Sequence, residues 1–196
     1  MIKFKVVVAG AKNVGKTSLI RRYATGKFDT STLSTIGVDF ETKKVIVDDN
    51  EILLNIWDFA GEKKFRLLLP SYVSGASGAL ILYDITNRES LADLHDWIKV
   101  ISSVPNSPKT KLLVEAKLDL EDQREINKED AEKIHYKYNF KGDIIGTSSK
   151  TGENVEQVFE MLGREILKSS LKKCSNCGRL YPLELKFCQH CGNRTL

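Results

Sequence analysis

A glycine-rich stretch near the amino terminus, GAKNVGKTS at residues 10–18, limits the possible folds more than any other part of the sequence. It follows a continuous apolar run at 3–10 and opens a helical pattern at 16–24. The spacing G-x4-G-K-T between a strand and a helix is typical of a phosphate-binding loop, because glycines let backbone N–H groups approach a phosphate. In such a loop the Lys16 ammonium neutralises β- and γ-phosphate oxygens, and the Thr17 hydroxyl ligates Mg²⁺. The sequence therefore predicts a P-loop site.

The main body alternates between strand and helix patterns, which predicts an open α/β sheet with right-handed connections. Its apolar runs are typical of strands buried on both faces of a parallel sheet. Residues 38–58 differ, because two strand patterns flank the turn at 48–50 and predict a hairpin with one antiparallel strand. The remaining strand patterns lie at 79–84, 111–116 and 143–147, and the remaining helical patterns at 90–101, 128–138 and 155–171.

All four cysteines lie near the carboxyl end, within CSNCGRLYPLELKFCQHCG at 174–192. Two Cys-x2-Cys pairs are separated by ten residues, and a glycine after each pair permits a knuckle turn. This is the spacing of a tetrahedral four-cysteine zinc site. A segment this short cannot fold by apolar burial alone, so metal would make it a domain. The sequence predicts a small zinc ribbon with Zn²⁺ bound by Cys174, Cys177, Cys188 and Cys191.

The length and the charge distribution of the chain indicate how its domains are organised. A chain of 196 residues suits one main domain and a small appendage, here 1–168 and 174–192 with a linker at 169–173. No apolar run is long enough to span a bilayer, and no cysteine lies in the main body, so we expect a cytoplasmic protein. The net charge of +4 is concentrated in the tail, which is basic. That tail contacts phosphate or an anionic membrane, or is simply a solvated face.

Beyond the P-loop, TIGVDF at 35–40 and WDFAG at 57–61 resemble the Ras superfamily of small GTPases, and are most similar to its Rab branch. The resemblance covers residues 3 to about 168. It implies a small G domain, with a mostly parallel six-stranded sheet and one antiparallel strand. It also implies a protein that binds GTP and GDP with Mg²⁺, hydrolyses GTP and switches through two mobile segments. We expect a monomer. Effector and regulatory proteins are the implied partners.

The resemblance also implies roles for single residues. Thr35 in switch I ligates Mg²⁺ and senses the γ-phosphate, Asp58 reaches the metal through water, and the Gly61 N–H meets the γ-phosphate. Switch II spans 59 to about 72, and the implied catalytic residues are Lys16, Gly61 and Glu62. The complete predicted nucleotide site comprises Gly10, Lys12, Asn13, Val14, Gly15, Lys16, Thr17, Ser18, Phe28, Thr35, Asp58, Gly61, Lys117, Asp119, Ser148, Ser149 and Lys150.

The base-binding part of that site follows the family motif with one departure. Phe28 stacks edge-on against the base, and the Asp119 carboxylate accepts hydrogen bonds from guanine N1 and N2. The loop at 148–150 supplies a backbone N–H to guanine O6. Ala116 replaces the usual asparagine next to Lys117, which removes a hydrogen bond and lowers affinity by up to roughly tenfold.

Two further departures bear on hydrolysis. Glu62 stands where the family has a water-orienting glutamine, and it either alters hydrolysis, in either direction, or turns to solvent. Lys12 occupies a P-loop position that is usually small, where it acts as a cation in cis, blocks a partner's arginine, or lies on the surface. Two alternative functions stay open: a weakly hydrolysing guanine-nucleotide-dependent binding module, and a G domain that regulates a nucleic-acid-binding ribbon.

The cysteine tail stands where most Rab-type proteins carry cysteines for prenylation. Cys191 is followed by five residues without a C-a-a-X box, and Ile2 excludes N-myristoylation. We therefore expect no lipid anchor and at most peripheral contact with an anionic membrane.

Overall fold

The structure, a computed structural model, describes residues 2–29, 37–61 and 69–194. A six-stranded sheet with the order β2-β3-β1-β4-β5-β6 forms its centre, and only β2 runs antiparallel to its neighbour. This confirms the predicted α/β fold. The elements in chain order are β1 (Ile2–Ala9), α1 (Lys16–Thr25), β2 (Val38–Val47), β3 (Asn50–Phe59), α2 (Leu69–Val73), β4 (Gly78–Asp84), α3 (Arg88–Ala92), α4 (Leu94–Ser102), β5 (Thr110–Ala116), the 3-10 helix η2 (Leu118–Gln123), α5 (Lys128–Lys137), β6 (Ile145–Thr147), α6 (Val155–Ser170), β7 (Leu171–Lys173) and β8 (Leu180–Pro182).

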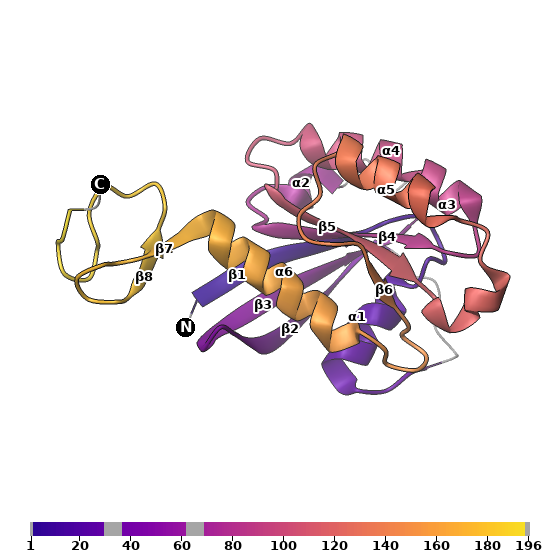
Figure 1. The fold of residues 1–196 in the computed structure, drawn as a ribbon, viewed down its shortest axis with the longest axis horizontal. Helices are drawn as coiled ribbons and strands as arrows, with labels where there is room; N and C mark the ends of the chain where they lie inside the picture. The colour runs from indigo at the N-terminus through magenta and orange to yellow at the C-terminus, as the bar shows by residue number, and fades with distance from the viewer. Residues whose placement is uncertain (1, 30–36, 62–68, 195–196) are drawn as a thin grey trace.

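Helices cover both faces of the sheet (Figure 1). Side chains of α1 and α6 form one hydrophobic core with the sheet, and side chains of α2, α3, α4 and α5 form the other. Every residue of β4 is buried, as expected for a central parallel strand that reads as a continuous apolar run. None of the described helices is both long and apolar enough to cross a membrane.

The predicted hairpin forms between β2 and β3, whose ends pair at Val47 and Asn50. Asp48 and Asp49 make a two-residue loop with φ of 45° and 62°, the left-handed conformation that aspartate tolerates in tight hairpin turns. Asn50 donates to the Asp48 carbonyl at 2.7 Å. The turn is therefore one residue shorter than expected, because Asn50 already belongs to β3.

The single helix predicted over 90–101 is divided into α3 and α4 at Asp93. Asp93 keeps helical backbone angles, with φ −65° and ψ −17°, so the chain direction changes little there. Its carboxylate accepts a hydrogen bond from the Trp97 indole at 3.1 Å. The break is therefore a local interruption of the helical hydrogen bonds, which no glycine or proline in the sequence marks.

The carboxyl-terminal tail begins without an irregular segment. Residues 169–173, expected as a linker, form the end of α6 and the strand β7, which pairs with β8. Leu171 and Leu180 of this hairpin pack against the core beneath α1 and α6. In Figure 1 the tail lies beside the start of β1, at the end of the molecule opposite to the loop that follows β1.

Candidate functional site

A pocket of about 450 Å³ opens at the carboxyl ends of β1 and β5. Ligands bind at this edge of open α/β sheets because the loops that follow parallel strands meet there. Gly10, Asp58 and Ser148 lie beside the pocket rather than on its surface, and the predicted residues Thr35 and Glu62 lie outside the described residues. The lining residues are Lys12, Asn13, Val14, Gly15, Lys16, Thr17, Ser18, Phe28, Phe59, Gly61, Ala116, Lys117, Asp119, Leu120, Ser149 and Lys150.

Two glycines allow backbone segments to approach closely at the phosphate-binding loop. Gly10 has φ of 145°, and a Cβ there would lie 2.4 Å from the Leu82 carbonyl oxygen. A Cβ on Gly61 would lie 2.5 Å from the Ala11 carbonyl oxygen and 2.5 Å from the Lys12 nitrogen. No side chain fits at either position, so the segment after β3 packs directly on the P-loop backbone.

Lys16 lies beneath this loop and is only 5% exposed. Its Nζ donates to the Gly10 carbonyl at 2.9 Å and to the Ala11 carbonyl at 2.8 Å. Burial lowers the pKa of the ammonium to about 8, although the negative charge of Asp58 acts in the opposite direction. A desolvated cation held by neutral carbonyls is complementary to an anion, which would replace those weaker partners.

Thr17, on the pocket surface, and Asp58, beside the pocket, bring two oxygen ligands together. The Thr17 hydroxyl donates to Asp58 Oδ2 at 2.5 Å, and Asp58 is 3% exposed at the end of β3. A hydroxyl and a carboxylate are ligand types that Mg²⁺ accepts. The arrangement therefore fits a magnesium ion next to the phosphate-binding loop.

The opposite end of the pocket is organised by two carboxylates. Asp119 accepts a hydrogen bond from the Ser148 hydroxyl at 2.6 Å and lies 3.8 Å from the Lys150 ammonium. Lys117 pairs with Asp84 at 2.6 Å. These contacts orient both charged side chains of the predicted base motif, although Ala116 supplies no side-chain hydrogen bond.

The sequence analysis assigned no role to Asp84, which ends β4. The signal lies in the register of the parallel sheet, in which Asp84 is the partner of Ala116, next to Lys117. The Asp84 carboxylate also accepts hydrogen bonds from the Thr86 N–H at 3.0 Å and from its hydroxyl at 2.8 Å. A buried acid that is satisfied in this way can hold a lysine in one orientation.

A cluster of aromatic side chains, which the sequence analysis also missed, lies on β2, β3 and α2. Ring centroids are separated by 5.2 Å between Phe40 and Trp57, and by 5.5 Å between Trp57 and Tyr72. Phe40 is 48% exposed. Phe40 and Trp57 are direct partners across the predicted hairpin, so its register is the signal that would have revealed the pair. We call these three residues the aromatic cluster.

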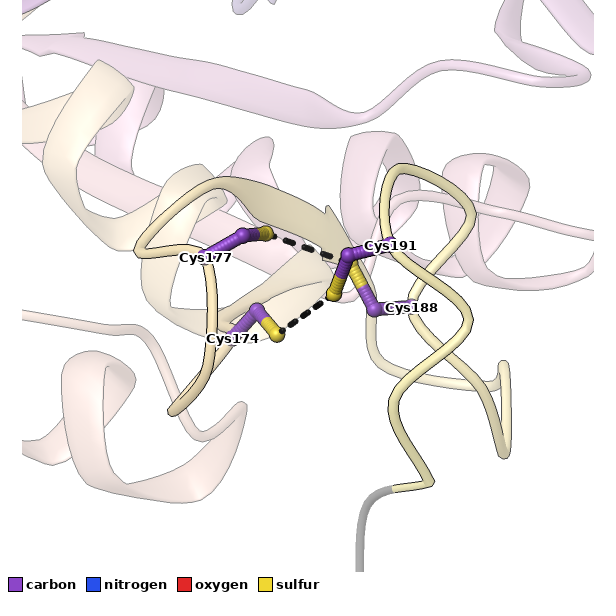
Figure 2. A group of neighbouring side chains, drawn as sticks. All are labelled: Cys174, Cys177, Cys188 and Cys191. Carbon is purple, nitrogen blue, oxygen red and sulfur yellow. Dashed lines mark hydrogen bonds between the residues drawn. The ribbon is translucent and has the colours of Figure 1, made fainter.

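The four cysteines of the tail converge on one point, as Figure 2 shows. All four sulfur atoms lie within 4.8 Å of one another. The Sγ atoms of Cys174 and Cys191 are 3.6 Å apart, and those of Cys177 and Cys188 are 3.7 Å apart. Both distances are close to the roughly 3.8 Å edge of a tetrahedron with metal–sulfur bonds of about 2.3 Å.

The two knuckles repeat the same backbone pattern. In each, the N–H of the first cysteine donates to the carbonyl five residues later, and the N–H of the glycine four residues later returns to the cysteine carbonyl. Both glycines have φ of 72°, a conformation that favours glycine. The four bonds, of 2.8 to 2.9 Å, join Cys174 with Arg179 and Gly178, and Cys188 with Asn193 and Gly192.

Comparison with known proteins agrees with this pocket and fold. A family model described as the Ras family matches residues 5–168. Ras-related protein Rab-8B of Homo sapiens is 36% identical over 173 residues, which cover 88% of this chain and 83% of that protein. Ras-related protein Rab-13 of Bos taurus is 34% identical over 186 residues, which cover 94% of this chain and 91% of that protein. The chain therefore belongs to the Ras family, as a Rab-like small GTPase.

Proposed function

We propose that this GTPase is a molecular switch that binds GTP and GDP together with Mg²⁺. The observation that carries the proposal is the pocket itself, because Lys16 lines its phosphate end and Asp119 its base end. Gly10 lets the loop pack against the Leu82 backbone, and Gly61 lets the segment after β3 pack against the backbone of Ala11 and Lys12. A nucleotide that spans the pocket would meet a cation at one end and a carboxylate at the other.

At the phosphate end, backbone N–H groups of residues 13–18 face the β-phosphate, and Lys16 turns from its two carbonyls to the phosphate oxygens. Thr17, Asp58 and Thr35 would hold Mg²⁺, which neutralises charge on the β- and γ-oxygens when bound. The Gly61 N–H would donate a hydrogen bond to the γ-phosphate, so loss of that phosphate would release the segments around residues 35 and 62.

At the base end, Asp119 accepts from the guanine N1 and N2 donors, while Ser148 and Lys150 fix the orientation of its carboxylate. Adenine has no matching pair of donors at these positions. Phe28, 38% exposed on the pocket wall, contacts the base, and the backbone of 148–150 meets guanine O6.

In this proposal the side chains of Glu62 and Lys12 set the rate of GTP hydrolysis. A carboxylate at position 62 accepts a proton from water but does not donate to the γ-phosphate as an amide does. Lys12 lines the pocket and would place a second cation near the phosphates. Single-turnover GTP hydrolysis by the wild type and by Glu62→Gln and Lys12→Ala variants separates these contributions.

A second candidate function is a guanine-nucleotide-dependent binding module with weak hydrolysis. Ala116, which lines the pocket without a polar group, and Glu62 favour it. The same single-turnover rates distinguish the two functions. In a binding module, GTP hydrolysis would be much slower than dissociation of the partner protein, so bound GTP would persist.

Zinc is the ion that we assign to the cysteine cluster. The four sulfurs surround one point at near-tetrahedral separations, and four thiolates are the preferred structural ligands of Zn²⁺. Elemental analysis of the purified full chain should give one zinc per chain.

Partners and location follow from the same features. The aromatic cluster includes the exposed Phe40, which belongs to the TIGVDF motif, so an effector that docks there would sense the nucleotide state. We place the protein in the cytoplasm, since its four cysteines lie together as a candidate metal site and not in disulfides. We also propose that it is a monomer.

Nucleotide titration tests the proposed switch directly. We expect the full chain with Mg²⁺ to bind GDP and GTP and to reject ATP, and Asp119→Asn to shift preference towards xanthine nucleotides. Equal affinities for ATP and GTP in titration calorimetry would contradict the proposal.

A further inference from the structure

The cysteine-rich tail carries apolar side chains on its surface. Leu183 is 42% exposed and Phe187 is 54% exposed, and both belong to the short loop between β8 and the second knuckle. Leu185, between them, packs inward against the small cluster around Cys174, Tyr181 and Cys188. The loop therefore directs one leucine into the tail and leaves the other two apolar side chains in solvent.

Two basic side chains belong to this loop or lie beside it. Phe187 and Arg194 are partners in an antiparallel bridge, so their side chains lie on the same face. Lys186 is exposed and directly precedes Phe187. Lys173 at the end of β7 and Arg179 at the end of the first knuckle are also exposed, and Glu184 is the one acidic residue in the described part of the tail, 171–194. We call Leu183, Lys186, Phe187 and Arg194 the ribbon tip.

We propose that the ribbon tip docks on an anionic membrane, with Leu183 and Phe187 entering the interfacial layer and Lys186 and Arg194 contacting lipid phosphates. Amphipathic surfaces bind such membranes by combining buried apolar area with attraction between Lys or Arg and anionic headgroups. The inference rests on the proposed zinc site, because the metal would hold the loop in the conformation that exposes these side chains.

The chemistry of the tip favours lipid over nucleic acid. Single-stranded nucleic acid is bound on aromatic side chains that stack with successive bases. Phe187 and His190 are the only exposed aromatic rings in the described tail, since Tyr181 is 1% exposed, and His190 Nε2 lies 3.3 Å from the Leu180 carbonyl oxygen. Leu183 has no ring on which a base could stack, but it suits the apolar part of a membrane interface.

The position of the tip is compatible with a membrane-bound switch. The tail lies at the end of the molecule opposite to the P-loop (Figure 1). A protein attached through the tip would therefore keep its nucleotide pocket directed away from the lipid, where exchange of nucleotide and access of other proteins are not obstructed.

Co-sedimentation of the full chain, loaded with GDP, with lipid vesicles tests the inference. The vesicles contain phosphatidylcholine alone or phosphatidylcholine and phosphatidylserine in equal amounts. We expect binding to the anionic vesicles only, weakened as salt rises from about 0.1 to about 1 M. Replacing both Leu183 and Phe187 by serine should lower the partition coefficient about tenfold. Lys186→Gln with Arg194→Gln should lower it by a similar factor, about tenfold.

Matched controls use side chains of the same kind elsewhere on the surface. Ile46→Ser removes a 71% exposed apolar residue from β2, and Lys99→Gln with Lys128→Gln removes two exposed charges from α4 and α5. These variants should bind vesicles as the wild type does. Zinc content and GDP content are measured on every sample, so failure of the metal or nucleotide proposal is recognised separately.

The inference is overturned if the zinc-loaded wild type does not bind anionic vesicles, or if the serine variant binds them as well as the Ile46 control. Tighter binding to single-stranded RNA than to the anionic vesicles at the same salt concentration would also overturn it, in favour of a nucleic-acid reader.

Discussion

At the scale of the single residue, Lys117 depends on Asp84. The Asp84 side chain is 7% exposed and that of Lys117 is 35% exposed, so water screens the pair only partly. Lys117 itself has φ of 66°, an uncommon left-handed conformation for lysine. Because Ala116 contributes no side-chain hydrogen bond, we regard the Asp84 contact as the main constraint on the lysine side chain.

Asp84→Asn should therefore accelerate release of bound GDP. The amide can still accept from Thr86 but no longer carries the charge that holds Lys117, and hydrogen bonds to charged groups contribute about 1.5–3 kcal/mol. We expect release to be about tenfold faster, measured with a fluorescent GDP analogue. Asp122→Asn, which changes an exposed aspartate of η2, is the control. Unchanged release would mean that Lys117 needs no partner.

The two carboxylates at the base end show what the sequence reveals at this scale. Asp119 was predicted because its motif is local, two residues after Lys117. Asp84 lies in another strand, and only the strand register brings it to Ala116. Thr35 and Glu62 lie outside the described residues, so their roles stay predictions.

At the scale of elements, a network of charged and polar groups joins β4, β5 and η2. The Tyr83 hydroxyl donates to Glu115 at 2.6 Å, and Arg124 donates to both oxygens of Glu115 at 3.1 and 3.0 Å. Arg124 also bonds Glu121 through two contacts of 2.7 Å. Burial, and then the hydrogen bond to Glu115, raise the pKa of Tyr83 above its ordinary value of 10.0.

Tyr83 should make the protein sensitive to alkali. A pKa that is raised in the folded state gives stability that is fully present below pH 10 and is lost as pH rises further, because the unfolded chain then releases a proton that the folded chain keeps. Tyr83→Phe should cost about 1.5–3 kcal/mol at neutral pH. The difference from the wild type should then narrow by about 1.4 kcal/mol per pH unit above 10.

Urea unfolding of both proteins between neutral pH and the alkaline range provides the measurement. Tyr136→Phe is the control, because that side chain is 78% exposed and should leave the free energy of unfolding unchanged at every pH. A difference between Tyr83→Phe and wild type that stays constant with pH would show that Tyr83 titrates normally.

Prediction of elements succeeded where one pattern dominates a segment. β1, β4 and β5 read as apolar runs because they are buried on both faces, and the helical spacing of α6 follows from its one buried stripe. The helices α2 and η2 were missed. The first has five residues, and the second has no buried residue, so neither produces a periodic signal. The strands β7 and β8 have three residues each, too few to show an alternation.

At the scale of the whole molecule, the tail and the G domain meet through a small contact. Leu171 and Leu180 pack on the main core, and the Ser169 hydroxyl lies 2.8 Å from that of Thr110. The Leu183 N–H donates to the Ser170 carbonyl at 3.0 Å. A folded tail should therefore add modestly to the stability of the G domain, and the pocket at the opposite end should not depend on it.

Loss of the proposed zinc ion provides the test at this scale. Cys188→Ser removes one of the four thiolates of the proposed zinc site, so we expect the proposed zinc ion to be released. The hairpin of β7 and β8 should then open, because a segment this short needs metal ligation to stay folded. Loss of the Leu180 contact should cost about 1 kcal/mol, which lowers the melting temperature of the GDP-bound protein by about 2–4 °C. The GDP affinity should stay within about twofold of wild type, since a stability change of this size at a distant site adds no direct contact with the pocket. Ser175→Ala, in the same tail but without a ligand role, is the matched control and should retain both the zinc content and the melting temperature of the wild type.

A large change in GDP affinity that accompanies zinc loss in Cys188→Ser, but does not occur in Ser175→Ala, would contradict this expectation. It would show that α6 couples the proposed metal site to the nucleotide pocket.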